Sequence, residues 1–143
     1  LLNISKAVKG PALFDKRLAL GSYVNVNFDD VTSTFSNNIG GDAGLIKNGT
    51  GTLILSGTST YSGLTKINGG RVIVNGSILS GVYVGVSGTL SSTGGYIGND
   101  VYNEGGTLEN SGTGLQIAGN YSALENSTIR SSVGSTIKVG GTA

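Results

Sequence analysis

The sequence predicts an all-β protein: a right-handed parallel β-helix, or solenoid, of about six short coils with a non-helical N-terminal lead-in. Three observations predict it. Short aliphatic runs alternate with polar residues, Gly and Asn-Gly dipeptides separate these runs, and a Gly-x-Leu/Val triplet returns at a nearly constant interval. Such a pattern is typical of a solenoid, in which each coil buries its apolar edge against its neighbours.

The repeat is about eighteen residues long. The triplet Gly51-Thr52-Leu53 returns at offsets of 19, 18 and 18 residues, as Gly70-Arg71-Val72, Gly88-Thr89-Leu90 and Gly106-Thr107-Leu108. We expect these Leu and Val side chains to stack in one column, with Phe35 at one end and Leu124 at the other, because Leu108 and Leu124 both begin the tetrapeptide Leu-Glu-Asn-Ser. A second inward column is predicted through Ile67, Val84, Tyr102, Ile117 and Val133.

The individual strands show the two-residue alternation of a sheet with one buried face. Leu53 with Leu55, Thr65 with Ile67, and Val72 with Val74 are expected to point inward, which leaves Lys66 and Arg71 on the solvent side. Between the strands stand Asn48-Gly49, Asn68-Gly69 and Asn75-Gly76, which are also hairpin signals. Hairpins would make neighbouring strands antiparallel, whereas stacked repeats require parallel strands, so we interpret these dipeptides as corners of a coil.

Two domains are predicted: residues 1–28 as a linker or cap that follows an upstream domain, and residues 29–143 as the β-helix. Because the chain begins with Leu1, we expect it to be an internal piece of a longer polypeptide. A left-handed β-helix also has coils of this length, but it requires a hexapeptide signature in which an aliphatic residue is followed by Gly. Steps of six from Leu53 reach Ser59 and Thr65, so the right-handed form is favoured.

The composition excludes several classes of function. Lys and Arg number 9 against 8 Asp and Glu, so no nucleic-acid partner is expected. The chain has no Cys and no His, which excludes disulfides, thiolate and imidazole metal ligands, and a Ser-His-Asp triad within this sequence. A hydrophobic content of 37% favours an ordered core over a disordered Gly-rich tract.

Few residues offer chemistry of their own. Lys66 near Ser62 is formally a Ser-Lys dyad, and two carboxylate groups, Asp29-Asp30 with Asp42 and Asp100 with Glu104, are formally calcium ligands. Scattered carboxylates are more often surface residues, and the Gly-rich residues 81–88 lack the strand, helix and acid of a dinucleotide site. The sequence therefore predicts no catalytic residue, no cofactor and no metal in this chain.

One stretch resembles a known repeat. Residues 48–57 (NGTGTLILSG), 59–63 (STYSG) and 67–70 (INGG) are similar to the passenger-associated transport repeat of bacterial autotransporters, which commonly reads G-x-G-T-L-x-L-x-G-x-N-T-Y-x-G and then T-x-V-x-G-G. The departures are Ser59, where Asn is usual, and Ile54, where a polar residue is commoner. Tyr61 stands at the aromatic position of the repeat and is expected to pack over a coil.

Two shorter resemblances concern the region before this repeat. Residues 35–39 and 44–47 resemble the lead-in strands of subtilisin-like autotransporters, and residues 1–3 with 7–12 resemble the end of their protease domain. The resemblance implies a passenger exported across the outer membrane by a C-terminal β-barrel translocator. It also implies an upstream subtilisin-like serine protease domain in the same polypeptide and a place on the bacterial cell surface or outside the cell.

The function that follows from the resemblance is structural: a β-helical stem that assists outer-membrane translocation and passenger folding. The alternative is an adhesin-type module that binds host surface proteins or glycans. A polysaccharide lyase is disfavoured because Lys66 and Arg71 have no carboxylate nearby in sequence. Open coil ends expose unpaired backbone groups, so we expect the isolated fragment to self-associate.

Overall fold

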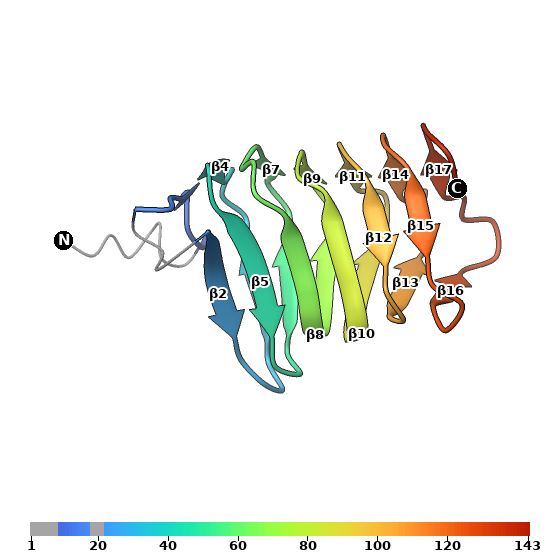
Figure 1. Ribbon diagram of the computed structural model, residues 1–143, viewed down its shortest axis with the longest axis horizontal. Coiled ribbons are helices and arrows are strands. Elements are labelled where there is room, and N and C mark those ends of the chain that lie inside the picture. The colour runs from blue at the N-terminus through green and yellow to red at the C-terminus, as the bar shows by residue number, and fades with distance from the viewer. Residues whose placement is uncertain (1–8, 18–21) are drawn as a thin grey trace.

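In the computed structural model, which describes residues 9–17 and 22–143, all the regular secondary structure is β-strand (Figure 1). Each recorded strand pairing is parallel, and the chain winds as a solenoid of about six coils. Asn-Gly corners therefore turn the chain from one face of a coil to the next, and the all-β solenoid prediction is confirmed. No helix in the described ranges is long and apolar enough to span a membrane.

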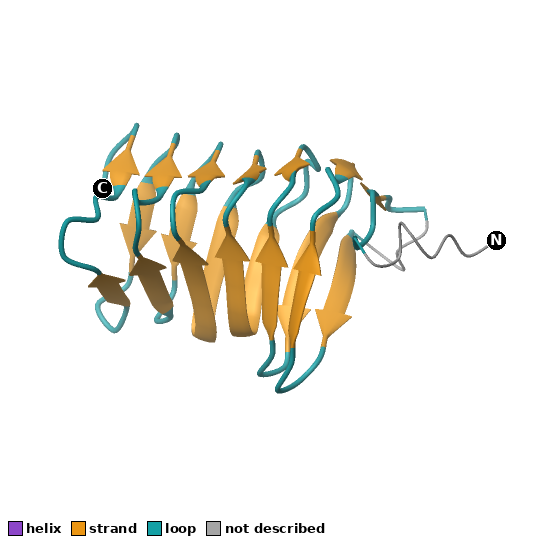
Figure 2. Cartoon of the chain, turned by 180° about the vertical axis from the view of Figure 1, so that it is seen from behind, coloured by secondary structure: helices purple, strands orange, loops and turns teal. Residues whose placement is uncertain are grey.

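The coils have three faces, with loops at the corners (Figure 2). Face one contains β2 (Tyr23–Asn27), β5 (Gly44–Asn48), the first parts of β8 (Thr65–Val74) and β10 (Val82–Ser92), β12 (Val101–Asn103) and β15 (Tyr121–Ala123). Face two contains β3 (Thr32–Phe35), β6 (Thr52–Leu55), the second parts of β8 and β10, β13 (Thr107–Asn110) and β16 (Thr128–Ser131).

Face three is built from short strands: β7 (Thr58–Ser59), β9 (Ser77–Ile78), β11 (Tyr96–Ile97), β14 (Gln116–Ile117) and β17 (Lys138–Val139). Its inward column holds Ile78, Ile97 and Ile117, all of them buried. The sequence predicted two inward faces per coil, and this third one was missed. Two-residue strands are too short to show an alternating pattern.

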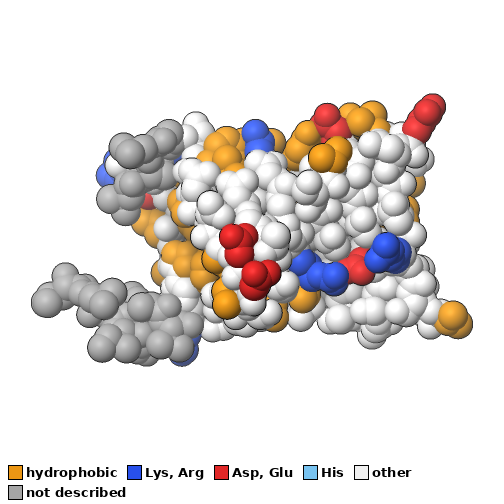
Figure 3. All heavy atoms as spheres, turned by 90° about the horizontal axis from the view of Figure 1, so that it is seen from below, with side chains coloured by type: hydrophobic (Ala, Val, Ile, Leu, Met, Phe, Trp, Pro, Cys, Tyr) orange, Lys and Arg blue, Asp and Glu red, His pale blue; other side chains and the backbone are white. Residues whose placement is uncertain are grey.

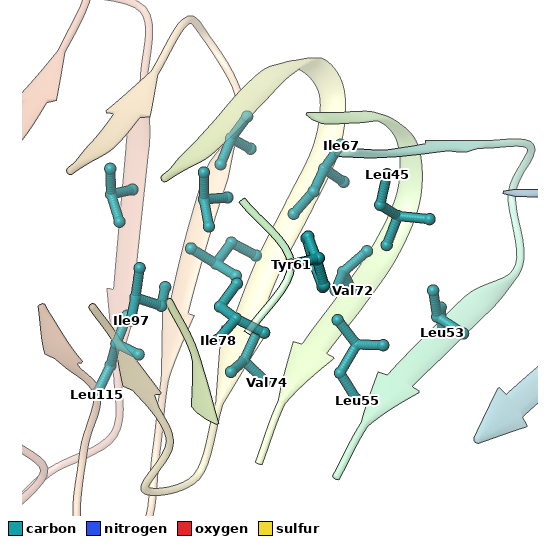
Figure 4. Close-up of a cluster of buried hydrophobic side chains, with 14 of the residues drawn as sticks. Leu45, Leu53, Leu55, Tyr61, Ile67, Val72, Val74, Ile78, Ile97 and Leu115 are labelled. Atoms are coloured by element: carbon teal, nitrogen blue, oxygen red, sulfur yellow. The ribbon is translucent and has the colours of Figure 1, made fainter. Parts of the chain in front are cut away.

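The predicted Leu and Val column is confirmed on face two. Leu53, Val72, Leu90 and Leu108 are successive register partners, and each is at most 1% exposed. Side chains from the different faces point toward one another in the interior (Figure 4). Equivalent residues on parallel strands lie about 4.8 Å apart, so each of these side chains packs on the one before it.

The predicted ends of this column are wrong. Phe35 is the register partner of Leu55, and Ile129, not Leu124, is the partner of Leu108. Leu124 lies after β15 and is 44% exposed. The step from Thr107 to Thr128 is 21 residues, whereas Thr89 to Thr107 is 18, because the last coil has longer corners. A fixed spacing therefore misplaces the residues beyond the regular coils.

The second predicted column is only partly correct. Ile67 and Val84 are buried register partners on face one, but the next position belongs to Asn103. Tyr102 points outward, since neighbouring strand residues face opposite sides. Ile117 lies on face three, and Val133 is fully exposed in a corner.

Inward polar residues hold the corners of the core. Ser92 Oγ accepts hydrogen bonds from the backbone N–H groups of Gly94 and Gly95, and Asn110 Oδ1 accepts one from Leu115 N at 2.7 Å. Ser92 and Asn110 are register partners on face two. A turn that leaves the sheet has backbone donors without ladder partners, so a buried side-chain acceptor at this position satisfies them.

The N-terminal boundary stays a prediction. Two strands lie before the predicted boundary between residues 28 and 29: β1 (Leu13–Phe14) pairs with β4 (Gly40–Gly41), and β2 pairs with β5. Asp15 beside β1 accepts hydrogen bonds from Arg17, and these lower the pKa of its carboxyl to about 2. Residues 1–8, including part of the segment that resembles a protease-domain end, lie outside the described residues.

Candidate functional site

The Ser-Lys pair singled out in the sequence is not brought together as a dyad. Lys66 Nζ lies 4.6 Å from the ring centroid of Tyr23, in a cation–π contact on face one. Within the described ranges no hydrogen bond joins Lys66 to Ser62, whose backbone N–H donates to Gly41 O. Lys66 is thus a partly exposed residue of an outward column.

The carboxylates Asp29 and Asp30 clamp a corner. Asp29 Oδ1 accepts hydrogen bonds from the backbone N–H of Thr50 at 2.7 Å and from its hydroxyl, while Asp30 Oδ1 accepts from the same hydroxyl at 3.1 Å. Asp42 accepts a hydrogen bond from Lys16 N instead. These carboxylates accept hydrogen bonds from backbone and hydroxyl donors about one coil away in the chain.

Asp100 and Glu104 also have separate partners. Asp100 Oδ1 accepts from Asn120 N at 2.7 Å, and Asn120 Oδ1 accepts from Thr142 N at 2.8 Å, so equivalent side chains connect successive coils. Glu104 accepts a hydrogen bond from the hydroxyl of Tyr83, and this bond raises the pKa of Tyr83. No three acidic residues of the described chain gather in a cluster that would hold a metal ion.

The Gly-rich residues 81–88 and Tyr61 both serve the solenoid. Most of the Gly-rich stretch lies in β10, whose register shifts between Val84 and Ser87 as the strand passes from face one to face two. Tyr61 is 1% exposed and its ring centroid lies 4.8 Å from that of Phe14, as expected for an aromatic packed over a coil. Burial raises the pKa of its hydroxyl, which lies 2.5 Å from the hydroxyl of Thr65.

The sequence did not predict that a lysine, Lys47, lies in the core. Lys47 is fully buried, and its Nζ donates to the carbonyl oxygens of Asn48 at 2.6 Å and Gly49 at 3.3 Å. The ammonium also lies 4.7 Å from the ring centroid of Phe28, and desolvation lowers its pKa. The sequence did contain a signal for this burial: Lys47 stands two residues after the inward Leu45, and alternate residues of a strand point to the same side.

The glycine that opens each repeated triplet lies against the preceding coil. A Cβ atom on Gly70 would overlap the carbonyl oxygen of Gly51, and one on Gly106 would overlap that of Gly85. Gly70 also has a φ of 66°, in the left-handed region that L side chains rarely adopt. The spacing between coils therefore explains why glycine stands at these two triplets.

One coil stacks on the next through the inward column of face two. Leu108, with a coil on either side, is 1% exposed, whereas its partner Ile129 on the last coil is 52% exposed. Burial in this column therefore depends on a following coil. The outer face of the last coil presents half-covered apolar side chains and strand backbone.

Comparison with known proteins agrees with this architecture. Residues 45–74 match the passenger-associated transport repeat family. The whole chain aligns with the Neisserial autotransporter lipoprotein NalP of Neisseria meningitidis serogroup B at 32% identity over 151 residues. The chain is an autotransporter passenger segment. It spans 14% of the length of NalP, so it corresponds to a small part of such a protein.

Two further relatives match parts of this passenger segment. The adhesin BmaC autotransporter of Brucella suis biovar 1 is 38% identical over 100 residues, which are 67% of this chain and 3% of that protein. An extracellular serine protease of Serratia marcescens is 48% identical over 61 residues, 43% of this chain and 6% of the protease. Together they place the passenger segment at the bacterial surface or outside the cell, after export across the outer membrane.

The match to the repeat family covers one coil of the passenger segment and part of the next. Residues 45–74 run from β5 through β6 and β7 to the end of β8. The buried side chains within this stretch include Leu45, Leu53, Leu55, Tyr61, Ile67, Val72 and Val74. The matched stretch thus contains buried side chains that stack one coil on the next.

Proposed function

We propose that this passenger segment is a structural β-helical stem that assists outer-membrane translocation and passenger folding. The observation that carries the proposal is the continuous inward column on face two, together with the match to the transport repeat. The strand pairings of the described residues join each coil to the coils directly before and after it. Such a chain is able to add coils one at a time outside the cell, without closing long loops.

Sequential stacking also supplies a direction to folding. A newly exported strand that pairs with the open edge buries apolar surface, worth about 25 cal/mol per Å². Ile129, half-exposed on the last coil, shows how much of a side chain the next coil would cover. Folding by this route opposes backward sliding of the chain, because each added coil would have to unfold before it returned.

The test is surface display of the full-length polypeptide with Leu53→Asp and Leu55→Asp, which place two carboxylates in the core. The matched control is Thr52→Asp with Ile54→Asp, on the same strand but pointing outward. We expect the inward pair to abolish display, measured by protease accessibility on intact cells, and the outward pair to retain most of it. Equal display of both variants would refute a need for coil stacking in export.

We also propose roles for the N-terminal residues, for the flanking domains of the polypeptide and for the open coil ends. Residues 1–28 would serve as a linker or cap between the β-helix and an upstream subtilisin-like protease domain, and a C-terminal β-barrel would export the chain. The isolated segment would self-associate through its open coil ends. Sedimentation velocity over a range of concentrations tests this last point, since an unchanging monomer would contradict it.

A second candidate function is an adhesin-type binding module for host surface proteins or glycans. One relative carries the name adhesin, and face one has an outward pair, Tyr83 and Tyr102, whose ring centroids lie 5.9 Å apart. Tyr102 is 39% exposed, so its ring is accessible to a partner. Saturable binding of the labelled segment to host cells, lost in Tyr102→Ala, would support this function.

A further inference from the structure

A hollow of about 300 Å³ opens on face two. It is lined by Arg71, Ser91, Glu109, Asn110, Ser111, Arg130, Ser131 and Ser132. Ser91, Glu109 and Arg130 are register partners on β10, β13 and β16, so the strand ladder forms its floor. Seen from below, the molecule has few charged side chains among mainly uncharged atoms (Figure 3).

Two guanidinium groups meet at one carboxylate in this hollow. Arg71 Nη1 donates to Glu109 Oε1, and Arg130 Nη1 lies 3.9 Å from Glu109 Oε2. Arg71, the register partner of Thr89 on β10, reaches past that strand to Glu109 on β13. Glu109 therefore holds both arginines on the same hollow and neutralises only one of their two charges.

Most donors in the hollow remain available. A guanidinium has five N–H donors, and a single carboxylate uses few of the ten that the two arginines offer. Among the described residues, the hydroxyls of Ser91, Ser111 and Ser132 form no hydrogen bond, whereas Ser131 Oγ accepts from Asn110 Nδ2 at 3.2 Å. The site thus combines an excess positive charge with free hydroxyl groups.

This chemistry fits an acidic sugar better than a peptide. Guanidinium forks match the planar carboxylate and the sulfate ester, and serine hydroxyls both donate to and accept from sugar hydroxyls. Protein partners generally anchor through buried aromatic or aliphatic groups, and no such side chain lines the hollow. Because the whole chain is nearly neutral, attraction to an anion would depend on this local cluster.

We propose that Arg71, Arg130 and the serines around them form a binding site for a carboxylate- or sulfate-bearing sugar of an extracellular polysaccharide. The arginines bind the anionic group, and the hydroxyls of Ser91, Ser111 and Ser132 bind the ring hydroxyls. Glu109 orients the arginines and competes with the ligand for them. The proposal does not depend on the stem function, since Arg71 and Arg130 stand next to the inward Val72 and Ile129 and therefore point away from the core.

The experiment is calorimetric titration of the chain with three tetrasaccharides: tetragalacturonate, sulfated maltotetraose and neutral maltotetraose. We expect saturable binding of at least one of the two charged sugars and none of the neutral one, and the comparison of the two separates carboxylate from sulfate recognition. Arg71→Gln with Arg130→Gln should weaken binding at least tenfold. Absence of saturable binding for both charged sugars would overturn the proposal.

Two further variants distinguish a built site from general charge attraction. Lys66→Gln with Lys138→Gln removes the same charge elsewhere and should change affinity less than twofold; an equal loss in this control would overturn the proposal. Glu109→Gln should tighten binding at least threefold by removing the competing carboxylate, a result that misfolding does not produce. Unchanged or weaker binding in Glu109→Gln would count against the assigned role of Glu109 and the site with it.

Discussion

Lys47 and Ile67 are register partners on β5 and β8, and both side chains are fully buried. An ammonium group thus occupies the same inward column as an aliphatic side chain. It is tolerated because Nζ donates to two corner carbonyls and faces the ring of Phe28. The column thus accommodates a long side chain at this level, with its ammonium held by backbone carbonyls and an aromatic ring.

Two replacements of Lys47 distinguish the contribution of its side-chain length to stability from the contribution of its charge. Lys47→Met keeps the volume and removes a desolvated charge, so the free energy of unfolding at pH 7 should stay within about 1 kcal/mol of the original. Lys47→Ala leaves a cavity and should lower it by about 2–4 kcal/mol. Urea unfolding measures both, and equal destabilisation by Met and Ala would show that the Nζ hydrogen bonds dominate.

The difference in stability between the original protein and Lys47→Met should depend on pH. Burial lowers the pKa of Lys47 in the folded state below its ordinary value of 10.5. Between the folded and unfolded pKa values the unfolded chain therefore binds more protons than the folded protein, so stability rises with pH. The contribution of Lys47 to stability is fully present above its unfolded pKa and is lost as the pH falls through its folded pKa. Relative to Lys47→Met, which does not titrate there, the original protein should gain stability as the pH rises from 7 toward 10.5. A difference that stays constant over this range would contradict the assigned burial.

Tyr61 should have the opposite effect. Burial raises the pKa of its hydroxyl above the ordinary value of 10.0, so its contribution is present below that pH and is lost as the pH rises through the folded pKa. Tyr61→Phe removes the titration and one hydrogen bond with Thr65, at a cost of about 1 kcal/mol at pH 7. Thermal unfolding at pH 8 and pH 11 should show a smaller alkaline loss in Tyr61→Phe than in the original protein.

Gly70 is expected to be intolerant of a methyl group. Gly70→Ala would meet the carbonyl oxygen of Gly51 and strain a φ of 66°, and should lower stability by at least about 3 kcal/mol. Gly134→Ala is the matched control, because Gly134 has a φ of 84° but open space around its Cβ position. It should lose only about 1–2 kcal/mol in denaturant unfolding. Similar losses at both sites would mean that contact with the preceding coil is unimportant.

Two leucines, each the first residue of a Leu-Glu-Asn-Ser tetrapeptide, test the strand register at the C-terminal end. Leu108→Ala empties a buried column position and should lower the free energy of unfolding by about 2–5 kcal/mol. Leu124→Ala affects a corner residue that is 44% exposed and should change it by less than about 1 kcal/mol. A large loss from Leu124→Ala in chemical denaturation would favour the placement of Leu124 in the column after Leu108, as the sequence predicted.

Much of the fold was predictable because the regular coils repeat both spacing and alternation. Between Leu53 and Leu108 the steps are nearly equal, so the stacked column followed directly from the sequence. The prediction failed at Phe35 and Leu124, where corners of different length change the step. It also placed Tyr102 inward, although Asn103 is the buried residue. A shift of one residue reverses the direction of a strand side chain, and spacing alone does not resolve it.

The amino-acid sequence by itself determined the strand class, the coil length, the parallel stacking and the transport repeat, because these depend on local pattern and on a motif in one contiguous stretch of the chain. The tertiary structure alone decided the third face, the buried position of Lys47 and the meeting of Arg71 with Glu109, 38 residues apart. In a solenoid, residues that touch across coils are separated by whole turns whose lengths vary. Their contacts are therefore fixed by the ladder register, which only the folded chain reveals.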